Sequence, residues 1–377
     1  MLSKLYDLTC LCAQYFVDPR RIRFSFPERK LWIHAASVGE LFAVLPILKR
    51  FDSFWITVTS KNGLHLLSRF AMDGGLMPLD LKNFVISALE QVNPKFVLFA
   101  ESEYWPNFCQ QIAEKKIPFG IVNYSLNTHS FLSRFFLSKK VWFLKKSVFV
   151  YTQNDNTRDT LISFGVKQAK VGGNIKILNE PSIDINFENQ LRNLRLSFPK
   201  IISLASLRKK DCLSLFPVLA QLLQQFHDIC LIIFPRYLEH VPFFVGEAKK
   251  YFGLAETYPR LGRVTIITKF GLVPTGVSQS LFYIIGGTFD METGGHSPFE
   301  GAWFGIPGIA GPGDWKISHQ RDLYIRIDSN ESSLEVLRKI ILNPRVLKDF
   351  SLRLKEEVEK TKTVADECVE IIKSYLV

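Results

Sequence analysis

The chain has 377 residues, 47% of them hydrophobic, which is long and apolar enough for two domains with their own cores. The six cysteines are scattered without a Cys-x-x-Cys pair, which argues against a disulfide framework or a zinc site and indicates a reducing compartment. The formal net charge is +11, and residues 1–180 contain 23 Lys and Arg against 14 Asp and Glu. Such a basic half favours an anionic partner, either nucleic acid or an acidic membrane surface. A nucleic-acid role would rest on net charge alone, and we expect none.

Residues 1–17 form an apolar segment that is too short to cross a bilayer. Lys4, Asp7 and Gln14 interrupt it, and no clean cleavage site of a secretory signal follows. We therefore expect residues 1–20 to be a membrane-associated segment that lies in the interface. The protein would then be peripheral.

Short apolar runs alternate with helical stretches, a pattern typical of parallel sheets with crossover helices. A polar break at Asn179–Ser182 separates two series of such runs. We accordingly predict an α/β protein with one domain over 21–180, a second over 190–343, and a charged helix over 344–377. The predicted strands are 31–35, 54–59, 96–100, 118–122 and 148–151 in the first series, and 200–205, 230–234, 264–268, 281–285 and 306–310 in the second.

The first strand ends in small residues and the turn Ser37-Val38-Gly39-Glu40, which opens a helix continuing to Lys49. The carboxyl end of a first strand is where open α/β sheets bind their ligands. Partial burial there would raise the pKa of the Glu40 carboxyl towards that of a working general base. A first-turn carboxylate also complements the helix dipole, and both interpretations remain open.

Residues 131–150 interleave aromatic and aliphatic residues with basic ones, at Arg134, Lys139, Lys140, Lys145 and Lys146. Such a segment is typical of a bilayer surface, with apolar groups in the interface and lysines near lipid phosphates. A buried helix with a solvated basic face would give the same pattern, so both interpretations stay open.

Two glycine pairs, Gly286-Gly287 and Gly294-Gly295, follow the apolar run 281–285. Behind them, Pro298 suits the first turn of a helix and Ser297 suits its cap. A strand, a glycine loop and a helix N-terminus together form a common phosphate site. Glu300, one turn further on, could accept hydrogen bonds from a ribose. Taken alone, the glycines would serve equally well to shape turns.

Several segments together resemble the 3-deoxy-manno-octulosonic acid (Kdo) transferases and occur in that family's order. They are Ala36-Ser-Val-Gly-Glu40, Glu101-Ser-Glu-Tyr-Trp-Pro-Asn107, Gly173-Asn-Ile-Lys176, Pro235-Arg236, Gly286-Gly-Thr288 and Gly294-Gly-His-Ser-Pro-Phe-Glu300. The first two are quite specific to the family. The resemblance implies a GT-B glycosyltransferase with two facing Rossmann-like domains and a cleft between them. By analogy, the helix over 344–377 would return to the first domain.

The resemblance further implies inverting, metal-independent transfer of Kdo from CMP-Kdo to a lipid A precursor (lipid IVA) in lipopolysaccharide core biosynthesis. The enzyme would work without a cofactor at the cytoplasmic face of the bacterial inner membrane. Glu40 would be the general base, and Ser37, Gly39, Glu101, Ser102 and Asn123 would form the acceptor side. The donor would be bound by Asn174, Lys176, Ser206, Arg208, Arg236, Gly287, Thr288, Gly294, Gly295, His296, Ser297 and Glu300.

The chemistry fits an enzyme without a metal site. The leaving group carries a single phosphodiester, which a helix N-terminus and an arginine can hold without Mg²⁺. The chain also has no Asp-x-Asp motif.

Some positions depart from the family pattern. Arg208 and Tyr237 stand where family members have histidine, Ser297 replaces an asparagine, and Leu178 replaces an aspartate. The acceptor-side Asn-Ala-Arg-Leu-Ser becomes Asn123–Asn127, which loses an arginine and a serine. An arginine still neutralises phosphate, but it cannot do the proton chemistry of histidine.

These departures keep two alternatives open. One is a GT-B enzyme that uses a nucleoside-diphosphate sugar, whose second phosphate the basic residues 208–210 would suit. The other is a non-catalytic membrane-bound relative that keeps the fold.

Overall fold

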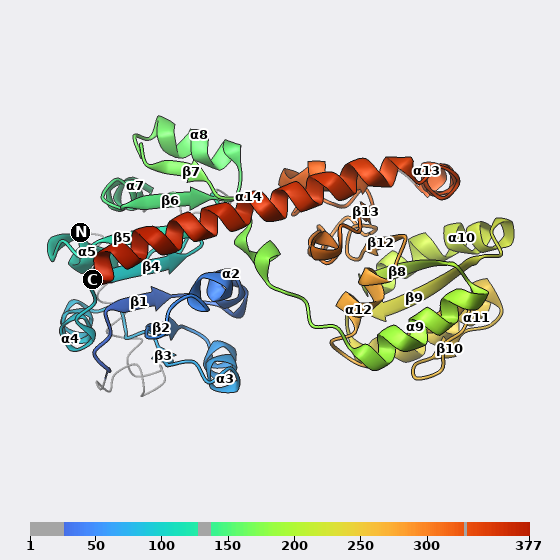
Figure 1. The fold of residues 1–377 in the computed structure, drawn as a ribbon, viewed down its shortest axis with the longest axis horizontal. Coiled ribbons are helices and arrows are strands. Elements are labelled where there is room, and N and C mark those ends of the chain that lie inside the picture. Colours follow the sequence, from blue (N-terminus) through green and yellow to red (C-terminus); the bar gives the residue numbers. More distant parts are fainter. Residues whose placement is uncertain (1–25, 127–136, 328–329) are drawn as a thin grey trace. The chain divides into compact units, whose positions relative to one another are not determined.

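The computed structural model describes residues 26–126, 137–327 and 330–377. The predicted membrane segment 1–20, as well as Arg134 and Asn127, lies outside these residues. The chain forms two compact units (Figure 1). Unit 1 runs up to Asn179 and includes Lys360–Val377, and unit 2 is Glu180–Glu359.

Within its described residues, unit 1 contains one parallel sheet in the order β3-β2-β1-β4-β5-β6-β7. Strands that follow one another in the chain are joined by helices, as parallel pairing requires. The strands are β1 (Leu31–His34), β2 (Trp55–Val58), β3 (Gly74–Leu76), β4 (Phe96–Ala100), β5 (Phe119–Tyr124), β6 (Phe149–Thr152) and β7 (Ala169–Val171). The helices are α2 (Val38–Leu48), α3 (Lys61–Arg69), α4 (Lys82–Val92), α5 (Pro106–Glu114), α7 (Leu137–Leu144), α8 (Asp155–Ser163) and the 3₁₀ turn η2 (Ile175–Leu178).

Unit 2 repeats this plan, with a parallel sheet in the order β10-β11-β9-β8-β12-β13-β14 over its described residues. Its strands are β8 (Lys200–Leu207), β9 (Ile229–Pro235), β10 (Glu256–Thr257), β11 (Val264–Ile266), β12 (Phe282–Ile285), β13 (Gly308–Ala310) and β14 (Tyr324–Arg326). Its α-helices are α9 (Ile185–Ser197), α10 (Lys209–Gln225), α11 (Val241–Phe252), α12 (Val273–Ser278) and α13 (Asn330–Leu342), and its 3₁₀ turns are η3 (Leu238–His240), η4 (Ala302–Phe304) and η5 (Ser318–Leu323).

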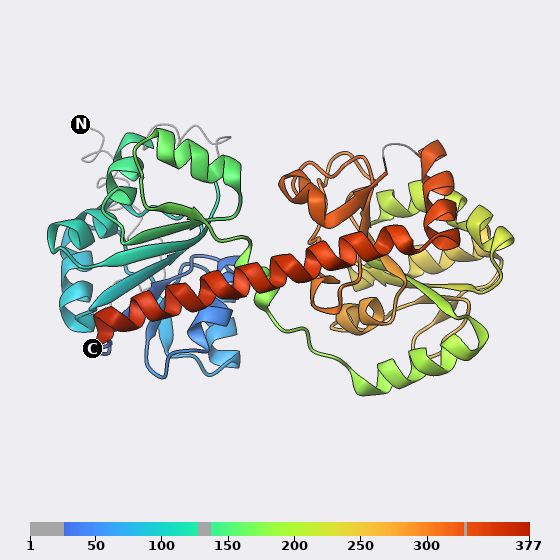
Figure 2. The same ribbon diagram turned by 45° about the horizontal axis from the view of Figure 1, so that its top comes forward.

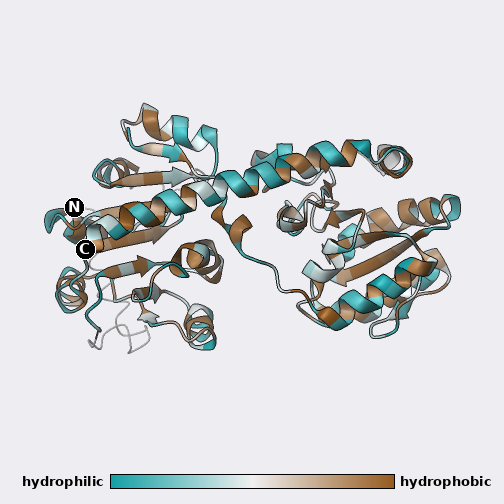
Figure 3. Ribbon diagram, viewed as in Figure 1, coloured by the Kyte–Doolittle hydropathy of each residue, from teal (hydrophilic) through white to brown (hydrophobic). Residues whose placement is uncertain are grey.

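The local sequence explains where these elements begin. The central strands are apolar and buried on both faces, as strands of a parallel sheet covered by helices must be (Figure 3). Polar side chains cap the helices that follow them: the Ser37 hydroxyl accepts from the Glu40 N–H, and the Asn154 and Asp184 side chains do the same at α8 and α9. The caps of α2 and α8 each lie in a turn at the carboxyl end of a strand, β1 and β6.

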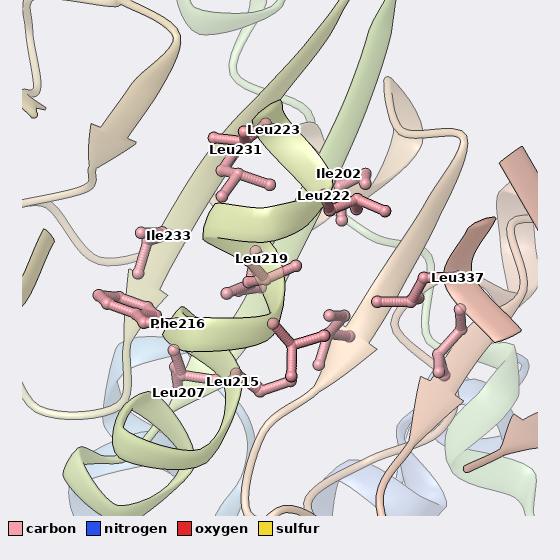
Figure 4. Packing of buried hydrophobic residues seen from close by; sticks show 14 of the residues in the cluster. Ile202, Leu207, Leu215, Phe216, Leu219, Leu222, Leu223, Leu231, Ile233 and Leu337 are labelled. Atoms are coloured by element: carbon pink, nitrogen blue, oxygen red, sulfur yellow. The ribbon is translucent and has the colours of Figure 1, made fainter. Parts of the chain in front are cut away.

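The core of unit 2 shows how the helices cover the sheet. Leu215, Leu219, Leu222 and Leu223 of α10 share one face and pack onto β8 and β9, together with Leu337 of α13 (Figure 4). Residues three and four apart on a helix lie on the same side, so α10 buries a continuous apolar stripe. The packed helix thereby fixes the position of its N-terminus at the end of β8.

Helix α14 (Arg345–Leu376) is one uninterrupted helix in both ribbon views (Figures 1 and 2). Its C-terminal part belongs to unit 1, where Cys368, Val369 and Ile372 are buried in the same cluster as Leu31 and Phe96. The N-terminal part up to Glu359 belongs to unit 2.

The α/β fold with parallel sheets is confirmed, and each of the ten predicted strands coincides with a strand of the structure. The four described strands that we did not predict, β3, β7, β10 and β14, are the edges of the two sheets. An edge strand is short and partly exposed, so it lacks the continuous apolar run that marks a central strand.

The helix predicted from Pro298 is wrong. Residues 298–301 form a turn that leads only into η4, three residues long. Gly305 ends η4 in the left-handed conformation, and a side chain at Gly301 would lie 2.0 Å from the Ile306 carbonyl oxygen. The chain has to return to β13 within these few residues, which leaves no room for an α-helix.

Candidate functional site

The topological switch point of unit 1 lies between β1 and β4, because β2 and β5 lie on their far sides. Ligands of open α/β sheets bind at the carboxyl ends of such a strand pair. The β1 turn carries Ser37, Gly39 and Glu40, and the β4 turn carries Glu101, Ser102 and Glu103. The fold therefore brings the two specific family motifs to one edge of the sheet.

Glu40 is buried, with 7% of its surface exposed. One carboxylate oxygen accepts a hydrogen bond from the Ala36 N–H at 2.7 Å, and the other accepts from the Ser37 hydroxyl at 3.0 Å. Burial raises the pKa of the Glu40 carboxyl from 4.5 to about 7, and the negative charges of Glu103 and Glu101 add to this rise. A carboxyl with this pKa is a strong enough base to take a proton from a hydroxyl group at neutral pH.

Glu101 lies in an ion pair with Lys176, whose ammonium group is 2.6 Å from a carboxylate oxygen. The Asn123 side chain donates to the same oxygen at 3.2 Å. Lys176 also lies close to the β1 turn, since a side chain at Gly39 would meet its Nζ at 3.7 Å. Lys176, which we predicted to bind the donor, thus lies beside Glu101 and the β1 turn of unit 1.

Asn123 and Asn174 shape the backbone around this ion pair. Asn123 is fully buried at the end of β5, and its side-chain oxygen accepts from the Ile175 N–H at 3.0 Å. Asn174 caps η2 by accepting from the Lys176 N–H at 3.2 Å. Both asparagines, predicted for the acceptor side and for the donor respectively, therefore position Lys176 through these contacts.

Ser102 contacts a second lysine, Lys140, which the sequence did not single out for the site and whose charge also acts on Glu103. Lys140 of α7 donates to the Ser102 carbonyl and lies 5.3 Å from the centre of the Tyr124 ring. Burial raises the pKa of Glu103, which the positive charge of Lys140 opposes, and burial lowers the pKa of Lys140. The turn after β4 thus holds two carboxyl groups, each beside a lysine.

Part of the Glu101–Asn107 motif is structural. The buried Asp80 carboxylate accepts from the Asn107 and Phe108 N–H groups at 3.0 and 2.8 Å, and so caps α5. The Asn107 side chain donates to the Asp80 carbonyl at 2.6 Å. This anchoring fixes the position of α5 behind the turn that carries Glu101.

The switch point of unit 2 lies between β8 and β12. The loop after β12 is held by Asp211, a fully buried residue in the first turn of α10 that the sequence analysis missed. Its carboxylate accepts from the N–H groups of Arg208, Gly287 and Phe289 at 2.9, 2.7 and 2.9 Å. Burial raises the pKa of Asp211, and these three hydrogen bonds oppose the rise. Asp211 therefore ties the start of α10 to the glycine loop.

The glycine loop needs its glycines for both conformation and space. Gly287, Gly294 and Gly295 all have positive φ. A side chain at Gly294 would meet the Trp315 ring at 2.5 Å, and one at Gly287 would meet Thr293 at 2.6 Å. Thr288 is fully buried, donates to the Ile285 carbonyl and accepts from the Gly311 N–H. Thr288 therefore has a structural role in the loop.

His296 lies within this loop beside positively charged groups. Burial lowers its pKa to about 4, and the charges of Arg236, Arg208 and Lys316 act in the same direction. The Arg208 Nε donates to His296 Nε2 at 3.5 Å. His296 is therefore neutral at neutral pH. Burial also raises the pKa of Glu300, and the charge of Arg236 opposes that rise.

The remaining predicted residues lie at the same end of the unit 2 sheet. Ser206 is half-buried at an irregularity of β8, whereas Arg236 and Ser297 are exposed after β9 and in the glycine loop. The Ser297 hydroxyl accepts from the Phe299 N–H at 3.2 Å, so it caps a turn where we expected a helix. The predicted residues thus form one cluster in each unit.

Backbone strain offers an independent signal. Six described residues other than glycine have positive φ, and three of them, Glu101, Asn123 and Ser206, are predicted site residues. Each lies at the carboxyl end of a central strand. Strained backbone costs free energy of folding, and it is found most often at functional sites, where a particular geometry is needed.

The described residues contain no group of three or more His, Cys, Asp or Glu side chains placed to hold a metal ion. Among the helices that the structure describes, none is long and apolar enough to span a membrane.

Solved structures with this architecture define the fold class. The chain is similar to a UDP-N-acetylglucosamine 2-epimerase, described as putative, from Listeria monocytogenes, with a TM-score of 0.66 and 13% identity over 92% of the chain and 96% of that structure. A glycosyltransferase from Rickettsia africae gives a TM-score of 0.60 at 12% identity, over 93% and 99% of the two chains. At such identities the likeness establishes the fold alone, and that fold is GT-B.

Sequence comparison relates the chain to one family. Residues 17–179 match the family described as 3-deoxy-D-manno-octulosonic-acid transferase (kdotransferase). The enzyme of that name from Rickettsia typhi is 27% identical over 93% of this chain and 81% of its own length, and the one from Chlamydia pneumoniae is 24% identical over 92% and 85%. The chain is thus similar to these glycosyltransferases over most of its length, at the modest identity expected of a divergent relative.

Proposed function

We propose that the chain transfers Kdo from CMP-Kdo to a lipid A precursor, with inversion at the anomeric carbon and with Glu40 as the general base. The similarity to the Kdo transferases supports the reaction class. The buried Glu40 carboxyl, with a pKa raised to about 7 at the switch point of unit 1, is the observation that carries the proposal.

In this reaction, Glu40 accepts the proton of an acceptor hydroxyl, whose oxygen attacks the anomeric carbon of the donor sugar. The bond from that carbon to the phosphate oxygen breaks, and CMP leaves with its electron pair. The Ala36 N–H and the Ser37 hydroxyl orient the carboxylate. The positive charges of Lys176 and Lys140 offset the negative charges of Glu101 and Glu103. The acceptor sugar would therefore bind at a surface with charges of both signs.

The donor would bind in unit 2. Arg236 and the loop of Gly294, Gly295 and His296 would hold the phosphate, and Glu300 would accept from the ribose. The neutral His296 can donate one hydrogen bond without adding a further charge. No α-helix begins at Pro298, and the N–H groups of Gly295 and His296 already donate to the carbonyl oxygens of Gly287 and Gly286. The guanidinium groups would therefore replace the helix terminus that we first expected.

We further propose that the protein works at the cytoplasmic face of the inner membrane. Helix α7 buries Phe143 and Leu144 but leaves Trp142 45% exposed, with Lys139 exposed on the same helix and Lys145 and Lys146 directly after it. Lys146 lies 4.9 Å from the centre of the Trp142 ring. An exposed tryptophan beside lysines is the arrangement expected at an anionic bilayer surface.

The experiment is a titration of the purified protein with CMP and with UDP, followed by calorimetry, for the wild type and Glu300→Ala. The proposal expects saturable CMP binding, weak or absent UDP binding, and loss of CMP affinity in the variant. Transfer from CMP-Kdo to lipid IVA should then be measurable in the wild type and lost in Glu40→Gln.

The other outcomes distinguish the alternatives. A preference for UDP over CMP would indicate a nucleoside-diphosphate sugar donor. Absence of nucleotide binding in a folded protein would indicate a non-catalytic relative.

A further inference from the structure

Arg208 is the centre of a small polar cluster at the N-terminus of α10. Its Nε donates to His296 Nε2, and its Nη2 donates to the Tyr237 hydroxyl, both at 3.5 Å. Its guanidinium carbon also lies 5.6 Å from the centre of the Tyr237 ring. The backbone of Arg208 is fixed as well, because its N–H donates to Asp211. The guanidinium is therefore held by two side chains, and the backbone of Arg208 is held by a third.

Neither Arg208 nor Arg236 forms an ion pair with a carboxylate among the residues that the structure describes. The nearby Lys210, in contrast, pairs with Glu292 at 2.6 Å. Two guanidinium groups without such a partner, at the ends of the adjacent strands β8 and β9, form a site for two anionic groups.

The two arginines differ in their neighbours. Arg208 precedes α10 and contacts His296 and Tyr237 through its guanidinium group. Arg236 directly follows β9, and its charge acts on the pKa of Glu300. If Glu300 binds the ribose, we take Arg236 as the group for the phosphate that follows the ribose and Arg208 as the group for the next anion.

The proposed donor has two anionic groups in this order. In a CMP-linked 3-deoxy-ulosonic acid, the phosphate follows the ribose, and the sugar carboxylate is attached to the anomeric carbon that bears this phosphate. Two of the five N–H groups of Arg208 are engaged with His296 and Tyr237, so three remain for a carboxylate.

We infer that Arg208, positioned by Tyr237 and His296, binds the carboxylate of the donor sugar, while Arg236 binds the phosphate. This inference rests on the proposed function and adds a specificity determinant to it. The side chain of Arg208 distinguishes a sugar that bears a carboxylate from a neutral one.

The test compares the affinities of CMP and CMP-Kdo, measured by calorimetry without acceptor, in the wild type and three variants. Arg208→Met should leave the CMP affinity within about twofold and reduce the CMP-Kdo affinity about tenfold or more, because a charge-assisted contact is lost. Arg236→Met should weaken both ligands. Tyr237→Phe keeps the ring and removes the hydroxyl, and it should weaken CMP-Kdo about threefold without affecting CMP.

Lys249→Met is the matched control, since it removes an exposed positive charge of α11 outside the site. It should change neither affinity, and thermal unfolding should show that all variants are folded.

Three results would overturn the inference. Equal weakening of CMP and CMP-Kdo by Arg208→Met would make Arg208 a phosphate ligand and leave the proposed function intact. If UDP bound more tightly than UMP, and Arg208→Met removed that difference, Arg208 would serve a second phosphate. Failure of the folded wild type to bind CMP or CMP-Kdo would refute the proposed function, and the inference with it.

Discussion

At the scale of single residues, the carboxyl groups after β1 and β4 differ in their partners. Glu101 has a lysine within 2.6 Å, whereas Glu40 is oriented only by an amide and a hydroxyl. The uncompensated burial of Glu40 raises its pKa, and this makes Glu40 the residue suited to accept a proton.

Glu40→Gln tests this assignment through the pH dependence of both activity and stability. As a base, Glu40 must be ionised, so kcat/KM of the wild type should rise with pH through about 7, and the variant should lose about 10²-fold or more.

For stability, the folded pKa of Glu40 lies above 4.5, so the folded protein binds the proton more tightly than the unfolded chain. The free energy of unfolding of the wild type should therefore fall by about 3 kcal/mol as pH rises from 4.5 through about 7. Glu40→Gln should not show this fall. Denaturant titrations at pH 5 and pH 8 measure the free energy of unfolding of the wild type and of Glu40→Gln, with the exposed Glu356→Gln as control. If the wild type and Glu40→Gln differed by the same free energy at both pH values, the assignment would be contradicted.

Glu103→Gln tests the electrostatic coupling. Removing the negative charge that most raises the pKa of Glu40 should move the pH–activity profile to lower pH. Glu114→Gln removes an exposed charge from the end of α5 and should leave the profile in place. An unchanged profile in Glu103→Gln would mean that burial alone sets the pKa of Glu40.

The sequence located Glu40 by the turn that follows an apolar strand, and Glu101 by its place in a family motif. It did not locate Asp211 or Lys140. An aspartate in the first turn of a helix usually serves the helix dipole, and its bonds to Gly287 and Phe289 join residues more than 70 positions apart. Such contacts depend on tertiary packing, and no spacing in the sequence marks them.

At the scale of elements, the glycine loop of unit 2 depends on α10 for its shape. Asp211 offers acceptors to three N–H groups, and asparagine would present an NH₂ group to at least one of them. Asp211→Asn should therefore weaken CMP binding about tenfold by loosening the loop. Asp228→Asn, an exposed residue at the opposite end of β9, is the control. Unchanged CMP affinity in Asp211→Asn would show that the loop does not bind the nucleotide.

The elements that were predicted and those that were not differ in a physical property. Central strands bury both faces and appear as uninterrupted apolar runs, while the edge strands β3, β7, β10 and β14 do not. The missing helix after Pro298 has another cause. Ser297 and Pro298 are local signals for the start of a helix. The end of η4, in contrast, depends on the close approach of Gly301 to the Ile306 carbonyl oxygen, which the local signals do not contain.

At the scale of the whole molecule, residues of one helix serve the cores of two units. Ile372 is fully buried in unit 1, so Ile372→Ala should lower the stability of that unit by about 2–5 kcal/mol. Hydrogen exchange should locate the loss in residues 26–179, while CMP binding by unit 2 persists. The exposed Lys373→Ala is the control, and equal loss of protection in both units would contradict this prediction.

The uneven charge of the chain leads to a prediction about membranes. Binding to vesicles that contain anionic lipid should weaken as salt rises. Replacing Lys139, Lys145 and Lys146 by Gln should reduce it about tenfold or more, at about 1 kcal/mol for each lysine near the surface. A triple Gln variant at Lys249, Lys250 and Lys339 of unit 2 should bind as the wild type does. Equal effects of the two variants would exclude α7 as the membrane contact.

The division of α14 also bears on how the protein is synthesised. All of unit 2 is contiguous, so its core can close as soon as residue 359 has left the ribosome. The sheet of unit 1 is encoded before unit 2, yet its core lacks Cys368, Val369 and Ile372 until the residues behind unit 2 have also been translated. The nascent sheet of unit 1 therefore keeps part of its apolar surface uncovered while the whole of unit 2 is synthesised.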